Sequence, residues 1–455
     1  MPAVWRERLH AQRRLARAAR PPRRAQSLEY NILLTATLCL LAAGAVMVYS
    51  ASSARTLLQG QGNGSGYLVR FVIYGAIGLL VMRFLSKGGL QRAQRLTGPL
   101  LGASFVLVLA VHIPHVGVQV NGARRWIGPG MLQFQPSEVM KLALVLYGAG
   151  LLARRPQDVF DLRRLARPLL LVVGAACLLV ASQPDLGTAL VIAFTTAALL
   201  VAAGMPMRHL ALLVALAFGA ITLYALVQPY SRARLTSFVN PWAHAGGSGF
   251  QAVQGQIAMG SGGLFGVGPG QSVQKAFYLP EAHTDFILAV IGEELGVVGV
   301  CALLCLYGLI AFAGLRAAKA ARSFYSALVA VGLTALVLSQ ATLNVFAVLG
   351  LAPLTGVPLP LISYGSSNMI VMLAAIGLLL DVASGGSAHL RAVRSPRTPS
   401  VRASPRAGTG PARDVDRAQP PRWHRGRDVD EDRDCRRRDR GSRRAGTGGS
   451  RRAAG

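Results

Sequence analysis

Long apolar stretches follow one another along most of this 455-residue chain. A helix needs about 20 apolar residues to cross a bilayer, and only helices and closed barrels satisfy their backbone groups there. Hydrophobic residues make up 52% of the chain and charged residues 15%. We therefore predict an all-α integral membrane protein with about ten transmembrane helices. The predicted spans lie near residues 31–50, 66–85, 97–113, 137–153, 166–183, 186–204, 207–228, 284–315, 325–350 and 362–383.

The net charge of +29 is concentrated at the chain ends, where about 27 of the 48 basic residues lie before Asn31 or after Ser384. The charge therefore belongs to two tails, and we expect no nucleic-acid partner. Residues 1–29 are predicted to be a basic cytoplasmic tail, and 386–455, which hold almost no large apolar residues, a disordered Arg-rich one. The second tail either stays solvated near lipid headgroups or binds a cytoplasmic partner. Residues 30–385 remain as the membrane domain.

The short connections that are rich in Arg and Lys all fall on one side of a ten-span alternation. Such connections stay in the cytoplasm, so we predict a protein of the cytoplasmic membrane with both termini cytoplasmic. The extracytoplasmic side then carries residues 114–136, 183–185, 229–283 and 351–361. The third of these is a long loop between the seventh and eighth spans.

The long loop is rich in glycine from Gly260 to Gly270 and ends in a charged segment that reaches Asp285. The glycines permit close backbone approach to a ligand, although a flexible linker has a similar composition. Asp285 stands at the outer mouth of the eighth span, where a carboxylate is either functional or a helix cap. Glu293 and Glu294 lie two turns deeper, so they are expected to face protein or water.

A second cluster contains Arg124 and Arg125, followed by Glu138 and Lys141 at the start of the fourth span. Glu138 and Lys141 are three residues apart and therefore share one helix face. They form either a structural ion pair or, through the buried ammonium, a partner for a pyrophosphate. Smaller polar turns surround Asp185 and Ser363 on the extracytoplasmic side. Because all these polar residues are predicted on one side of the membrane, we expect them to form one site.

The motifs in this order resemble those of the SEDS family (shape, elongation, division and sporulation), over roughly residues 30–385. The residues that carry the resemblance are 121–126 with 135–141, 183–187, 278–286 with 292–296, and 360–365. The form of Ser272–Lys275 followed by Tyr278–Asp285 is similar to the FtsW-like, division branch. Two departures, Leu288 and the run Ser366-Ser367-Asn368, affect fine specificity and leave the acidic site intact.

The resemblance implies a peptidoglycan glycosyltransferase that polymerises lipid II on the outer face of the cytoplasmic membrane. The family's essential aspartate matches Asp285, which would act as the base. Cations near it would stabilise the departing lipid diphosphate. The candidate cations are Arg232, Arg234, Lys275 and Lys141. The other candidate substrate-binding residues are Glu138, Arg124, Arg125, Glu281, His283, Asp185 and Ser363.

The expected partners are lipid II, a class B penicillin-binding protein and other divisome membrane proteins. No metal-ligand cluster is visible, and the sequence leaves open whether a divalent cation (Mg²⁺ or Mn²⁺) shares the phosphate chemistry. Three alternatives also stay open: a lipid II flippase, an elongation-type polymerase and a non-catalytic scaffold. A flippase needs polar residues along a continuous path to the cytoplasm, whereas these motifs crowd the outer half.

Overall fold

The computed structural model describes residues 27–58, 64–120, 123–128, 133–276, 278–279 and 281–394. Asn121 and Gly122, the first two residues of the motif at 121–126, and most of the two predicted tails lie outside these ranges. Within the described part, nine helices are long and apolar enough to cross a membrane, and α8 is a shorter apolar helix. The predicted class, an all-α membrane protein, is confirmed.

The spanning helices overlap the predicted ranges, but α2 ends at residue 58 instead of 50 and α4 begins at 89 instead of 97. Helix α14 runs past the expected boundary at residue 385. Their bounds are α2 Leu28–Leu58, α3 Gly66–Leu85, α4 Gly89–Ala110, α5 Pro136–Arg154, α7 Leu171–Ala181, α8 Leu186–Ala202, α9 Met207–Val227, α12 Ile287–Lys319, α13 Phe324–Val348 and α14 Ser366–Arg394. Short segments η2 Pro156–Phe160, α6 Leu162–Leu165 and the π-helical η3 Ala166–Leu170 precede α7, and α6, η3 and α7 together form one candidate span, Leu162–Ala181.

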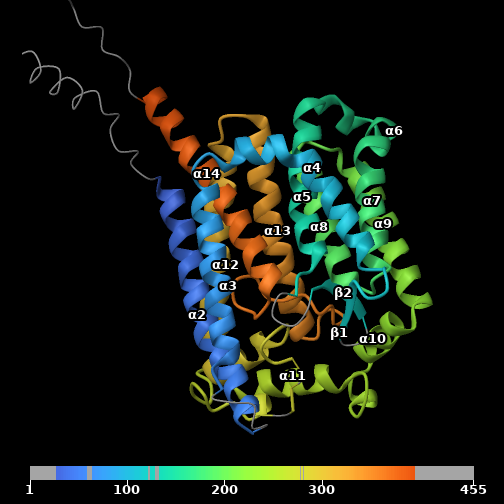
Figure 1. The fold of residues 1–455 in the computed structure, drawn as a ribbon, viewed down its shortest axis with the longest axis vertical. Helices are drawn as coiled ribbons and strands as arrows, with labels where there is room; N and C mark the ends of the chain where they lie inside the picture. Colours follow the sequence, from blue (N-terminus) through green and yellow to red (C-terminus); the bar gives the residue numbers. More distant parts are fainter. Residues whose placement is uncertain are drawn as a thin grey trace, which may run out of the picture. The chain divides into compact units, whose positions relative to one another are not determined.

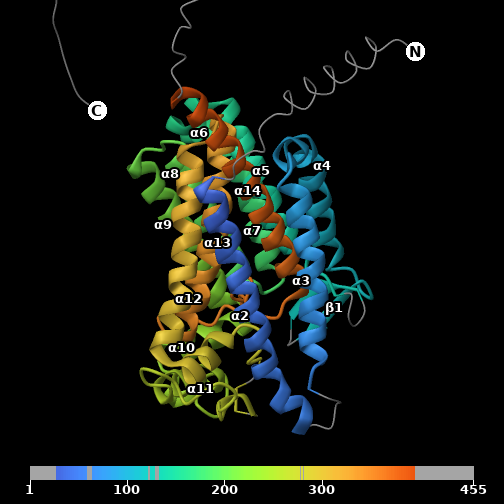
Figure 2. The ribbon, with the colours of Figure 1, turned by 90° about the vertical axis from the view of Figure 1, so that its left-hand side faces the viewer.

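The start of α2 and the later part of α14 lie at the same end of the bundle (Figure 2). The Ser27 hydroxyl donates a hydrogen bond to the Ala383 carbonyl at 3.3 Å. The Asp381 carboxylate nearby accepts from the backbone N–H groups of Gly88 and Leu90, at 2.9 and 3.0 Å. The Asp381 bonds cap the turn between α3 and α4, and the Ser27 bond joins the two ends of the helical region.

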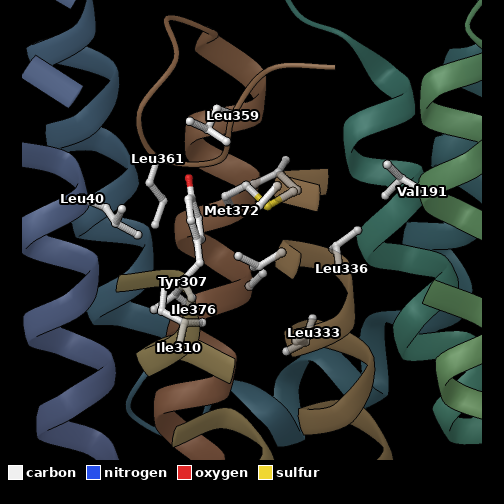
Figure 3. Close-up of a cluster of buried hydrophobic side chains, with 14 of the residues drawn as sticks. Leu40, Val191, Tyr307, Ile310, Leu333, Leu336, Leu359, Leu361, Met372 and Ile376 are labelled. Carbon is white, nitrogen blue, oxygen red and sulfur yellow. The ribbon is translucent and has the colours of Figure 1, made fainter. Parts of the chain in front are cut away.

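Apolar side chains fill the middle of the bundle, around α13 (Figure 3). The core is built from several helices and from the connection between α13 and α14, and includes Leu40, Val191, Tyr307, Ile310, Leu333, Leu336, Leu359, Leu361, Met372 and Ile376. The Tyr307 hydroxyl donates to the Pro360 carbonyl at 2.5 Å. This bond ties the α13–α14 connection to α12.

The connection between α9 and α12 is partly helical, whereas the sequence suggested a loop. It contains α10 Pro229–Val239, η4 Trp242–His244, α11 Phe250–Ser261 and η5 Gln274–Ala276. A hairpin that the sequence did not indicate, β1 Gly117–Val120 with β2 Ala123–Ile127, lies at the same end as α10 and α11 (Figure 1). This end of the bundle carries the polar residues singled out above.

The glycine-rich segment packs against a break in α12. Gly296 has φ +67° and ψ −164° inside this helix, which interrupts its hydrogen bonding. The N–H of Val297 instead donates to the Gly263 carbonyl at 3.0 Å, and the N–H of Val267 donates to the Glu293 carbonyl at 2.9 Å. The glycines thus allow backbone to approach backbone, and the segment is a packed part of the fold, not a flexible linker.

Candidate functional site

Asp285 is half-buried in the turn just before α12 and does not cap that helix, since Phe286 holds the capping position and no side chain bonds there. The interpretation of Asp285 as a helix cap is therefore wrong. Its backbone carbonyl accepts a hydrogen bond from the Asn344 Nδ2 atom at 2.7 Å. The backbone of this turn is consequently bonded to α13, and the Asp285 carboxylate takes no part in capping the helix.

Two carboxyl groups share one hydroxyl beside the helix start. The Thr284 Oγ1 atom lies 3.2 Å from a carboxylate oxygen of Glu281 and 3.2 Å from one of Asp285. Burial raises the pKa of the Asp285 carboxyl from 3.8 to about 6, and the Glu281 charge adds to this, while the Arg234 guanidinium opposes it. A carboxyl with such a pKa is ionised at neutral pH and yet basic enough to take a proton.

Arg234 of α10 faces the same point as Asp285. A Cβ atom placed on Gly356, whose φ is +70°, would lie 3.6 Å from Arg234 Nη1 and 3.9 Å from an Asp285 oxygen. The guanidinium is held by the Leu354 carbonyl at 2.9 Å and by the Tyr230 hydroxyl at 2.6 Å, and it lies over the Tyr230 ring. The Asp285 carboxylate and the Arg234 guanidinium therefore both lie within 4 Å of the place where a side chain at position 356 would begin.

The connection between α13 and α14 organises this region. Its carbonyls at Leu354, Val357 and Pro358 accept hydrogen bonds from Arg234, Asn344 and Gln340 respectively. Gly187 lies against it, since a Cβ there would come within 2.4 Å of the Val357 side chain. Helices α8, α10 and α13 thus all contact the segment that carries Gly356.

Lys275 lies in a buried ion pair with Glu294. Its Nζ atom is 2.7 Å from a Glu294 oxygen, 3.0 Å from Ser50 Oγ and 2.8 Å from the Gly270 carbonyl. The neighbouring Glu293 accepts from Ser272 Oγ and from the Val273 N–H. Both glutamates face protein, as predicted, and they hold the loop against α12.

Lys141 and Glu138 also form a buried pair, with 2.9 Å between Nζ and Oε1. The Lys141 ammonium donates to Gln340 Oε1 at 2.8 Å, and Asn368 Nδ2 donates to the second Glu138 oxygen at 2.9 Å. Both charges are thus satisfied by side chains of α13 and α14. The structural ion pair considered from the sequence is confirmed.

Arg125 pairs with Asp185 at 3.7 Å and donates to the carbonyls of Gln183 and Pro184. Asp185 also caps α8 through the Thr188 N–H. Arg124 is exposed, and it lines a cavity of about 280 Å³ together with Val111, His112, Gln119, Ala123, Ser182, Gln183 and Pro184.

The remaining candidates take different positions. The His283 ring is tilted against the rings of Tyr67 and Tyr364, with centroids 4.3 and 5.7 Å away, and the two tyrosine rings also contact each other. Ser363 Oγ accepts from the Leu359 N–H at 2.8 Å and so closes a turn. Arg232 is exposed on α10.

The structure adds Asn344, Gln340 and Tyr230, which the sequence reasoning missed. It also gives Asn368, which the sequence showed only as a departure from the family pattern, a hydrogen bond to Glu138. Asn344 and Gln340 are the two amide side chains of a span that is otherwise apolar apart from serine and threonine, and they stand four residues apart. This spacing on one helix face was the signal that could have found them. Among the residues that the structure describes, no three His, Cys, Asp or Glu side chains gather as they would around a metal ion.

The fold and these contacts define a multi-pass membrane protein with a carboxylate and a guanidinium close together at one end of a helix bundle. The profile of the Cell cycle protein family, which groups FtsW, RodA and SpoVE, matches residues 31–387. The chain belongs to this family.

Curated relatives are similar over most of their length. Stage V sporulation protein E of Bacillus subtilis is 39% identical over 351 residues, which are 77% of this chain and 96% of the relative. A probable peptidoglycan glycosyltransferase FtsW of Coxiella burnetii is 42% identical over 356 residues, 77% of this chain and 95% of the relative.

Solved structures agree with the fold. A chain from a study of "Structural coordination of polymerization and crosslinking by a peptidoglycan synthase complex" has a TM-score of 0.65 and 32% identity, covering 80% of this chain and 98% of its own. The rod shape determining protein RodA of Thermus thermophilus has a TM-score of 0.57 and 30% identity, with the same coverage.

Proposed function

We propose that this chain is a peptidoglycan glycosyltransferase that polymerises lipid II at the outer face of the cytoplasmic membrane. The observation that carries the proposal is the half-buried Asp285 carboxyl, with its pKa raised to about 6, which faces Arg234 beside Gly356. The names of curated relatives support the reaction class.

Asp285 acts as the general base in this proposal. Its carboxylate accepts the proton of the acceptor sugar's 4-hydroxyl as that oxygen bonds to the donor's anomeric carbon, and the bond from this carbon to the diphosphate oxygen breaks. A base is most effective when its pKa lies near the working pH. Arg234 stabilises the negative charge that grows on the departing undecaprenyl diphosphate.

The other predicted cations stay predictions as substrate contacts. Lys275 and Lys141 each have a buried carboxylate partner, so we propose that they act by positioning the polypeptide around the site. Arg232 and Arg124 are exposed at the same end of the bundle and are free to approach a diphosphate or a sugar-linked peptide. A divalent cation brought with the diphosphate would share the charge stabilisation.

The apolar core favours polymerisation over transport. Lys141 borders a space of only about 10 Å³, whose other walls are Leu144, Val145, Ile192, Thr195, Thr196, Leu199 and Leu336. A flippase would need a polar route through this region, because a headgroup cannot cross an apolar, close-packed core. The named polar residues instead lie at the end that carries α10 and α11.

We further propose that the chain works in cell division with a class B penicillin-binding protein. The similarity to probable FtsW proteins supports a septal role, and the similarity to a chain of a peptidoglycan synthase complex supports a transpeptidase partner. The predicted orientation, with both termini in the cytoplasm, places Asp285 on the outer face.

Proteoliposomes with fluorescent lipid II test the proposal. We expect glycan strands to form when the purified chain and a class B penicillin-binding protein are present together, and no transfer of lipid II between leaflets. Transfer without strand formation would show a flippase and overturn the proposal.

A further inference from the structure

A cavity rich in arginine lies at the end of the bundle opposite to Asp285. Its volume is about 770 Å³. In both ribbon views α6, which contributes to it, lies at the end away from α10 and α11 (Figures 1 and 2). The lining residues, called the arginine cavity below, are Arg155, Asp158, Arg163, Arg164, Arg167 and Pro168.

The chain between α5 and α7 is folded so that exposed arginines border one open surface cavity. Three short elements, η2, α6 and η3, follow one another here. Val159, Leu165 and Leu169 are fully buried and anchor this segment to the bundle. The Tyr147 hydroxyl donates to the Pro168 carbonyl at the π-helical turn. Because one face of the segment is anchored, the exposed arginines are held around the cavity.

The cavity carries an excess of positive charge. Four arginines and one aspartate line it. Among the ion pairs of the described residues, the one formed here joins Arg164 to Asp161 at 3.3 Å, and both side chains are largely exposed. Such a pair neutralises little of the field. An anion with more than one negative charge would therefore be attracted to this cavity.

Apolar side chains beside the cavity favour a lipid over a soluble anion. Phe160, which is 61% exposed, lies within the segment that lines the cavity, and Leu171, which is 66% exposed, follows that segment in the chain. The segment follows the end of one candidate span at Arg154 and includes the start of the next at Leu162. We therefore expect its arginines to lie at the headgroup level of a bilayer. A ligand with phosphates and acyl chains would contact both the arginines and the apolar side chains, since clusters of arginine next to a transmembrane helix attract anionic headgroups.

We infer that the arginine cavity binds the headgroup of an anionic phospholipid, with a lipid that carries two phosphates preferred. In the proposed orientation this lipid belongs to the cytoplasmic leaflet. This surface lies far from the proposed glycosyl-transfer site. Its test therefore measures lipid binding, and the result does not depend on polymerisation.

Native mass spectrometry of the full chain in detergent, with added cardiolipin or phosphatidylcholine, tests the inference. We expect wild type to retain cardiolipin selectively, and the double variant Arg163→Gln/Arg167→Gln to bind it at least about tenfold more weakly. Arg155→Gln/Arg164→Gln should weaken binding likewise. The matched control is Arg92→Gln/Arg208→Gln, at the same end of the bundle, which should bind as wild type does.

Inorganic pyrophosphate distinguishes the source of the anion. We expect millimolar pyrophosphate to leave bound cardiolipin in place, because it lacks acyl chains. Displacement would mean a soluble phosphate ligand and would overturn the lipid assignment. Equal cardiolipin binding by wild type and both cavity variants, with unfolding temperatures unchanged, would overturn the site itself.

Discussion

The Asn344 side chain of α13 donates hydrogen bonds to the backbone carbonyls of Asp285, at 2.7 Å, and of Val357, at 2.8 Å. One amide thus joins the turn that carries the proposed base to the segment that carries Gly356. The distance between the Asp285 carboxylate and Arg234 consequently depends on a residue that belongs to neither element.

Replacing Asn344 by alanine should lower turnover about a hundredfold, because a base misplaced by about 1 Å loses its alignment with the acceptor. The variant should also lose about 2 kcal/mol of stability, since two carbonyls lose their donor. Turnover with lipid II and thermal unfolding in detergent measure the two effects. Ser339→Ala, on the same helix, is the matched control, and wild-type turnover of Asn344→Ala would contradict the positioning role.

Arg234 should control the pH dependence of the reaction. The base is active when ionised, so the rate of the wild type should fall as the pH drops through about 6. Arg234 favours the ionised carboxylate, and Arg234→Gln should therefore raise the pKa and move this decline to higher pH. Turnover at neutral pH should fall about a hundredfold, because charge stabilisation is lost as well.

The pH–rate profile of Arg232→Gln provides the comparison on the same helix. Arg232 is exposed, so its removal should leave the acidic decline where it is in the wild type. Identical pH–rate profiles for Arg234→Gln and wild type would show that Arg234 does not affect the pKa of the catalytic base.

Lys275 and Glu294 should behave as a coupled structural pair. Removing one partner leaves a buried charge without compensation, so Lys275→Met or Glu294→Gln should each cost about 3–5 kcal/mol. The double variant should recover part of this loss, because no lone charge remains. Thermal unfolding of the four proteins gives the coupling energy, and strictly additive losses would show that the two residues do not interact.

Much of the fold follows from apolar run length alone. The spans were predictable because each helix must be apolar over a bilayer's thickness, whatever it packs against. The α9–α12 connection was not, since α10 and α11 have mixed composition and gain stability from tertiary contacts. The break at Gly296 was also invisible, because a glycine inside an apolar span signals neither a kink nor its docking partner.

The candidate site was predictable as a set of residues and not as a geometry. Asp285 and Arg234 stand 51 positions apart in the sequence by their numbers, and only the fold brings them to Gly356. Spacing did reveal the pair of Glu138 with Lys141, because three residues make almost one helical turn. The partner of Lys275 was hidden, since Glu294 comes near it only where the glycine segment packs on α12.

The most direct test of the account is strand formation from labelled lipid II by Asp285→Asn, purified with a class B penicillin-binding protein. The amide has nearly the same shape but cannot take a proton, and it carries no charge to bury. We predict that polymerisation falls at least about a thousandfold, while the unfolding temperature stays at or above that of the wild type. Glycan strands formed in wild-type amount and length by Asp285→Asn would contradict the assignment of this carboxylate as the base.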